Sequence, residues 1–154
     1  MRLIHQFHSQ GNYHDNGQVM CTHPHIDGKL EGLQQSYFQV KDDSPEGSID
    51  RGPLQSQVNF VDGKQDEFAQ FYLRNGQLES KKHFRDGTQD GLQETYHQNG
   101  QIKVSWNIKD EVKHRPYEDY YKNGQLKSKR QFIDGKKVSV KHYSKNGELE
   151  KGLL

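Results

Sequence analysis

The chain has 154 residues, of which 29% are hydrophobic and 28% charged, and its mean hydropathy is −1.19. This length predicts one domain over residues 1–154, and the low hydrophobicity excludes a large globular core. A single cysteine excludes an internal disulfide, and no apolar run approaches the length of a membrane span. Eight Tyr, seven Phe and one Trp at regular intervals argue against disorder, so we expect a thin, repetitive fold.

The net charge of +1 hides an asymmetry along the chain. Residues 1–70 carry five Lys/Arg and ten Asp/Glu, net −5, whereas residues 71–154 carry seventeen and eleven, net +6. The two ends should therefore have opposite electrostatic potentials. The lone Cys21 and an N-terminus without a signal-peptide-like apolar run predict a reducing, cytoplasmic location.

Two kinds of turn sequence recur at a period of about two dozen residues. The tripeptide Asn-Gly-Gln begins at positions 75, 99 and 123, with an early copy at 16 and Asn-Gly-Glu at 146. A second turn, Asp-Gly, follows at 27–28, 62–63, 86–87 and 134–135, with Asp110-Glu111 as a degenerate version. Because both central residues of a type I′ turn need positive φ, these dipeptides predict β-hairpin turns.

The segments between the turns alternate with a period of two, as half-buried strands do. After one turn the alternate residues are Leu78, Ser80, Lys82 and Phe84. Tyr37 occupies the equivalent slot in the one unit that has an insertion. In the other units a tyrosine stands four positions before the Asn-Gly glycine: Tyr13, Tyr72, Tyr96, Tyr120 and Tyr143. The sequence therefore predicts an all-β fold of about six tandem antiparallel β-hairpin repeats in one elongated, twisted sheet, with Leu, Phe and Tyr rows as its narrow core.

The pattern Tyr-x-x-Asn-Gly-x-Leu, followed by Phe-x-Asp-Gly-x-x-x-Gly, resembles the bacterial variant of the MORN repeat. The clearest copies are residues 72–78 and 84–91, and the resemblance extends from about Tyr13 to Leu149. It implies a non-catalytic scaffold with no cofactor. Bacterial proteins of this kind are described as antitoxin or immunity components that bind and block a toxin, and others as surface or envelope proteins.

Two departures from the repeat stand out. Eleven extra residues between Tyr37 and Leu54 predict an inserted acidic loop at about 40–52. The unit at Asp110-Glu111 lacks its turn glycine and has Pro116 where another unit has Leu92, which predicts a bulged unit or one exposed at a sheet edge.

Metal and catalytic sites find little support in the pattern. The densest histidine group is His23-Pro24-His25, but these residues fall in strand slots and Cys21 has no second cysteine beside it. Cys21 occupies a strand slot, and no glycine elbow surrounds any serine, so we expect no catalytic residue. We expect no metal site either.

The charge asymmetry leaves three interpretations of the partner. The basic second half, with Trp106 and Tyr121, suggests nucleic acid, but interleaved acidic residues make a solvated strand face the better interpretation. The acidic first half fits the basic cleft of a toxin nuclease. The predicted partner-binding residues are four on the insertion and three near repeat turns: Asp42, Asp43, Glu46, Asp50, Asp15, Asp62 and Asp66.

The leading hypothesis is thus an immunity or antitoxin protein that binds a cognate toxin. A structural scaffold at the envelope or surface is the alternative, and an RNA-associated repeat protein comes third. The sequence leaves the oligomeric state open.

Overall fold

A computed structural model describes residues 7–40, 51–109, 112–133 and 136–150 of the chain. These residues form no helix and build one open antiparallel sheet, which confirms the predicted all-β class. The strands follow the order β1-β2-β4-β5 and so on to β13, with the short β3 paired to β2. The strands are β1 (Phe7–Tyr13), β2 (Val19–Ile26), β3 (Lys29–Leu30), β4 (Gly32–Tyr37), β5 (Leu54–Val61), β6 (Lys64–Tyr72), β7 (Leu78–Arg85), β8 (Thr88–Tyr96), β9 (Ile102–Lys109), β10 (Val112–Tyr120), β11 (Leu126–Ile133), β12 (Lys136–Tyr143) and β13 (Leu149–Glu150).

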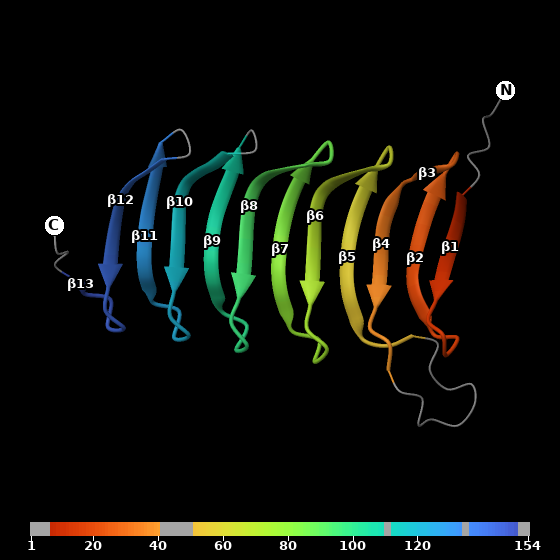
Figure 1. Ribbon diagram of the computed structural model, residues 1–154, viewed down its shortest axis with the longest axis horizontal. Helices are drawn as coiled ribbons and strands as arrows, with labels where there is room; N and C mark the ends of the chain where they lie inside the picture. The colour runs from red at the N-terminus through yellow and green to blue at the C-terminus, as the bar shows by residue number, and fades with distance from the viewer. Residues whose placement is uncertain (1–6, 41–50, 110–111, 134–135, 151–154) are drawn as a thin grey trace.

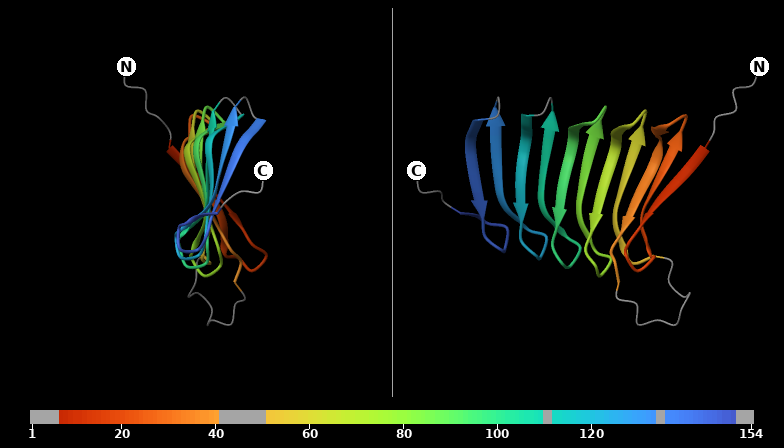
Figure 2. Two further views of the ribbon diagram at one scale, coloured as in Figure 1. Left: turned by 90° about the vertical axis from the view of Figure 1, so that its left-hand side faces the viewer. Right: turned by 45° about the vertical axis from the view of Figure 1, so that its right-hand side comes forward.

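The strands stand side by side across the long axis of the molecule (Figure 1). Seen along that axis the sheet is a single twisted layer, with no second sheet or helix against either face (Figure 2). The Asn-Gly turns lie at the lower end of the strands in Figure 1, and the described Asp-Gly turns, at 27–28, 62–63 and 86–87, lie at the upper end. The predicted elongated single sheet of hairpins is therefore confirmed.

The two turn types have different backbones. Asp27, Asp62 and Asp86 have φ near +50°, and the glycines after them have φ of 80° to 86°, so these are type I′ turns as predicted. In the Asn-Gly turns only the glycine has positive φ. There the amide of Gly76 donates to the carbonyl of Leu73, and the amide of Leu73 donates to the carbonyl of Gln77. The type I′ prediction was thus wrong for Asn-Gly, which closes a wider loop, with a bulge beside Tyr72, Tyr96 and Tyr120.

The pairing register separates two faces, because directly opposed residues of paired strands share a face. We call one the tryptophan face; its central row is Val58, Ala69, Lys82, Gln93, Trp106, Tyr117, Arg130 and Val140. We call the other the glutamate face; its central row is Gln57, Gln70, Lys81, Glu94, Ser105, Glu118, Lys129 and Lys141.

Very little of the protein is buried. Among the described residues, the buried ones are Gln18, Cys21, Tyr37, Val58, Ala69, Gln93 and Ser128. Val58, Ala69 and Gln93 belong to the central row of the tryptophan face, so the narrow core follows that row. The expected Leu, Phe and Tyr rows are mostly half-buried, because a single layer leaves both faces open to water.

The degenerate unit at Asp110-Glu111 was predicted to be either bulged or at a sheet edge. The bulge is confirmed, because the register shifts between His114 and Tyr117. The other prediction, an edge position, was wrong: β10 pairs with β9 on one side and β11 on the other. The bulge absorbs Pro116, which has no amide to donate to a neighbouring strand.

The insertion joins the sheet at its lower end. The amide of Val40 donates to Oε1 of the buried Gln18 at 3.1 Å, and Arg51 donates to the Tyr37 hydroxyl at 3.0 Å. The predicted loop residues Asp42, Asp43, Glu46 and Asp50 lie outside the described residues. Within the part of the chain that the structure describes, no helix is long and apolar enough to cross a membrane.

Candidate functional site

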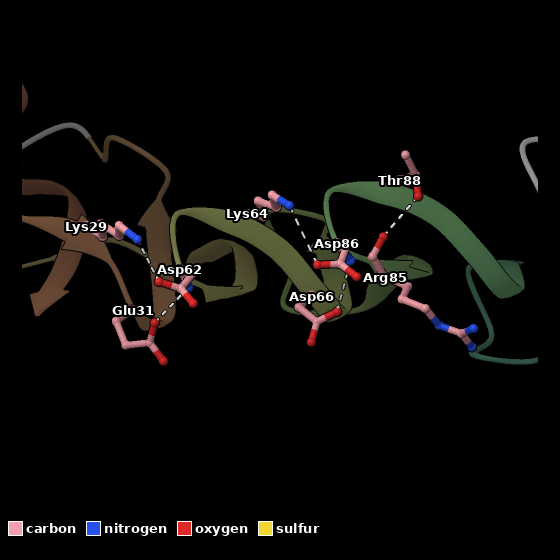
Figure 3. Close-up of polar contacts among 8 residues, drawn as sticks. All are labelled: Lys29, Glu31, Asp62, Lys64, Asp66, Arg85, Asp86 and Thr88. Atoms are coloured by element: carbon pink, nitrogen blue, oxygen red, sulfur yellow. Dashed lines mark hydrogen bonds and ion pairs between the residues drawn. The ribbon is translucent and has the colours of Figure 1, made fainter.

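The Asp-Gly turns of the first three units are linked to each other by the same contacts (Figure 3). Nζ of Lys29, just after the first turn, lies 2.8 Å from Oδ1 of Asp62 in the next turn. Nζ of Lys64 lies 3.7 Å from Oδ1 of Asp86 in the same way. The residue after one turn glycine therefore pairs with the aspartate of the following turn.

A second repeated contact involves the acidic residue two positions after each of these lysines. The amide of Asp62 donates to Oε2 of Glu31 at 2.8 Å, and the amide of Asp86 donates to Oδ1 of Asp66 at 3.3 Å. Glu31 and Asp66 both stand three residues after a turn glycine. Since a turn amide would otherwise bond to water, each carboxylate fixes the turn that follows it.

The backbone adds a third contact. The amide of Gly63 donates to the carbonyl of Leu30 at 2.9 Å, and the amide of Gly87 donates to the carbonyl of Gln65 at 2.8 Å. Because glycine makes the αL conformation of these turns inexpensive, the amide can point at the preceding unit without strain. The spacing between successive turns is thus set by the main chain as well as by side chains.

These turns display a row of carboxylates, which we call the acidic turn row: Asp27, Glu31, Asp62, Asp66, Asp86 and Asp90. Three cations, Lys29, Lys64 and Arg85, lie among them, so six negative and three positive charges leave a net charge of −3. The hydrogen bond from Lys29 lowers the pKa of the Asp62 carboxyl and raises the pKa of Lys29.

The turn aspartates of the row, Asp27, Asp62 and Asp86, are open to solvent. The side chains of Asp62 and Asp86 are 75% and 82% exposed, so their ion pairs contribute little to stability and can exchange for others. A hollow of about 350 Å³ opens between the first two turns, lined by Ile26, Asp27, Lys29, Glu31 and Asp62. This end of the sheet can accept cationic groups of a partner.

The structure divides the predicted partner-binding residues. Asp62 and Asp66 lie in the acidic turn row, whereas Asp15 lies in the β1–β2 turn at the other end of the strands. Eight strand residues separate the two ends by about 26 Å. One compact partner contact therefore cannot be centred on both Asp15 and Asp62.

Sequence reasoning missed four members of the row, Asp27, Glu31, Asp86 and Asp90. Their signal was in the repeat register: Asp27 and Asp86 are turn aspartates like Asp62, and Glu31 and Asp90 share with Asp66 the slot three residues after a turn glycine. Acidity and nearness to a turn, without the repeat register, do not single these residues out.

The histidine group lies on β2. Sγ of Cys21 is 3.0 Å from Nε2 of His23, and the His23 and His25 ring centroids are 6.5 Å apart. In the part of the chain that the structure describes, no three or more His, Cys, Asp or Glu side chains are arranged to hold a metal ion.

Two basic residues on β11, in the second half, are paired with acidic neighbours. Lys129 lies 2.7 Å from Glu118, and Arg130 lies 3.1 Å from Asp119. Trp106 belongs to the opposite face from Lys129, stacked on Tyr117 at 5.9 Å between ring centroids. The Trp106 and Tyr117 rings and the Lys129 side chain therefore do not form one surface.

Comparison with known proteins identifies the repeat. Residues 89–110 and 116–134 match the MORN repeat variant. Each matched segment begins in a returning strand, β8 or β10, and ends at the next Asp-Gly slot. The match supports the MORN-repeat family that the sequence resembles. A comparison with curated proteins gave no match.

Proposed function

We propose that this protein is a non-catalytic binding protein that neutralises a cognate toxin by direct, stoichiometric contact. The observation that supports the proposal is the acidic turn row, in which interlocked turns hold carboxylates along one end of the sheet. The toxin as partner follows from the resemblance of the repeats. A nuclease is the class of toxin that the charge favours, because its substrate cleft is basic.

The regular spacing of the turns suits this role. Successive Asp-Gly turns are two strands apart, which places them about 10 Å from each other. Because the turns are already bonded to one another, little conformational freedom is lost when a partner binds. A complementary acidic surface also speeds association with a basic partner.

The first test is co-purification of a tagged copy from the native host, with mass spectrometry of the proteins retained through a moderate salt wash. We expect one toxin-like protein near one-to-one stoichiometry. Retention of envelope proteins alone would favour the structural scaffold instead. Nucleic acid that salt removes would favour the RNA-associated alternative.

The second test asks which acidic group makes the contact. The variant Glu31→Gln, Asp62→Asn, Asp66→Asn, Asp86→Asn removes four charges but keeps an oxygen to accept each turn amide. We expect at least a tenfold loss of partner affinity, mostly through slower association.

The matched control is Asp42→Asn, Asp43→Asn, Glu46→Gln, Asp50→Asn, which removes the same number of charges from the insertion. If only the control weakens binding, the contact is the insertion and not the acidic turn row. Unchanged affinity in both variants would reject an acidic contact altogether.

A further inference from the structure

The sheet has an open edge at β12. Its inner side pairs with β11 from Ile133 back to Ser128, whereas on its outer side β13 pairs only with His142 and Tyr143. Every residue of β12 from 136 to 142 is exposed. Within the described residues, the outer side of positions 136–141 therefore has no strand beside it. Backbone groups on such an edge can pair with another strand.

One side chain on this edge is electrostatically unbalanced. Lys141 lies directly opposite Lys129 in the central row of the glutamate face. The Lys129 ammonium is committed to Glu118 on the other side, at 2.7 Å. Like charges directly opposite each other across strands are unfavourable. A carboxylate on the outer side of Lys141 would relieve this, as Glu118 does for Lys129.

The opposite face of the same strand is apolar. Val140 is 40% exposed and Val138 is 51% exposed, and Val140 lies opposite Arg130 on the tryptophan face. From 138 to 141 the edge thus has Val138 and Val140 on one face and Ser139 and Lys141 on the other. A strand that matches both faces would alternate between apolar and acidic residues.

The short β13 shows the mode of pairing. It runs antiparallel to β12, with Leu149 opposite Tyr143 and Glu150 opposite His142. An apolar and an acidic residue therefore already occupy the first two positions of this edge.

We propose that an extended acidic segment of a partner protein adds to the outer edge of β12 as an antiparallel strand. Main-chain hydrogen bonds to residues 136–141 supply affinity, and a carboxylate opposite Lys141 with an apolar side chain opposite Val140 supplies selectivity. This contact goes beyond the proposed function, because it uses the C-terminal edge of the sheet and not the acidic turn row, and because its partner is acidic and not basic.

The probe is an eight-residue labelled peptide that alternates glutamate and valine, acetylated and amidated, with fluorescence anisotropy as the measurement. We expect the full-length protein to bind it, and Lys141→Glu to weaken binding about tenfold. The same variant should gain about tenfold for a peptide with lysine in place of glutamate. The control Lys103→Glu changes the charge equally on β9, an interior strand, and should leave binding nearly unchanged.

Backbone pairing is tested without changing the protein. A glutamate–valine peptide with N-methyl groups on alternate residues keeps its charge but loses donors, and we expect it not to bind. Equal binding of the methylated peptide, or an equal loss in Lys103→Glu and Lys141→Glu, would reduce the effect to non-specific attraction and overturn the proposal. A dimer in sedimentation that the peptide does not dissociate would assign the edge to a second copy and overturn it as well.

Discussion

The two halves of the sheet, here β1 to β7 and β8 to β13, share one backbone repeat but connect successive units through different side chains. In the first half, Lys29–Asp62 and Lys64–Asp86 link neighbouring turns at the upper end of the strands. In the second half, Trp106, Tyr117 and Phe132 form an aromatic row near the middle, with centroids 5.9 and 6.3 Å apart. Among the described residues, the contacts that link units are thus polar at the upper end of the first half and aromatic near the middle of the second half.

The tyrosine slot differs between the halves in the same manner. The Tyr72 hydroxyl donates to the side-chain Oε1 of Gln70 at 3.3 Å. The Tyr96 and Tyr120 hydroxyls instead donate to the carboxylates of Glu94 and Glu118, at 2.8 and 2.7 Å. The partner two residues before the tyrosine is thus neutral in one half and charged in the other. The turns and register hold the fold constant, so the side-chain slots are free to vary with function.

The largest difference between the halves should appear in the stability lost when the residue at one repeat position is replaced by alanine in each half. Lys82, Trp106 and Arg130 are 24 residues apart and share the central row of the tryptophan face. Trp106→Ala should lower the free energy of unfolding by about 3 kcal/mol, because it removes a half-buried ring and its stack on Tyr117. Lys82→Ala should cost less than about 1 kcal/mol, because only a cation over the Phe71 ring is lost.

Urea denaturation measures both values. Trp106→Phe is the control, since it keeps a ring against Tyr117 and should recover roughly half of the loss. Equal costs for Lys82→Ala and Trp106→Ala would show that stacking does not distinguish the two halves.

A smaller difference should appear at the bulge four residues after each Asp-Gly glycine. Gly91 has φ of 103° there, and a Cβ would lie 3.3 Å from Cβ of His83. Glu67 occupies the same slot with φ of 60°. Gly91→Ala should destabilise by about 2 kcal/mol, because it adds strain and a close contact, whereas Glu67→Gly should stabilise by about 0.5 kcal/mol. Thermal midpoints would contradict this if both variants shifted in the same direction.

Most of the fold could be predicted from the sequence, because turn dipeptides and two-residue alternation are local signals. Asp27-Gly28 and its copies require positive φ, and that requirement sets where each hairpin turns. The Asn-Gly turns were mispredicted because the same dipeptide also closes a wider loop, and the choice depends on the bulge beside the tyrosine. The interior place of β10 depended on non-local pairing, which Pro116 alone could not indicate.

The candidate site was less predictable, because it depends on which residues adjacent repeats bring together. Glu31 and Asp62 are 31 positions apart in the chain, yet one bonds to the amide of the other. Composition indicated an acidic half but could not separate Asp15 from Asp62, which face opposite ends of the strands. A repeat register applied to carboxylates would have grouped Glu31 with Asp66.

The smallest difference between the halves should appear at alkaline pH. Burial, then hydrogen bonding and charge from Glu94, raise the pKa of Tyr96 to about 12, and burial with Glu118 does the same for Tyr120. For Tyr72 burial alone raises the pKa. Since the ordinary value is 10.0, an unfolded chain ionises first, so the stability these tyrosines contribute is present below pH 10 and is lost between pH 10 and 12.

Replacing the glutamate two residues before each tyrosine of the second half by glutamine should bring the pKa of these tyrosines closer to that of Tyr72. Glu94→Gln and Glu118→Gln remove the carboxylates but leave burial, so the pKa of Tyr96 and Tyr120 should fall toward its ordinary value. Tyrosinate absorbance and thermal midpoints from pH 9 to 12 report the change, with Gln70→Glu as the reverse exchange that should raise the pKa of Tyr72. If none of the three substitutions changes the titration curves, burial alone sets the pKa of these tyrosines. The tyrosine position would then not distinguish the two halves.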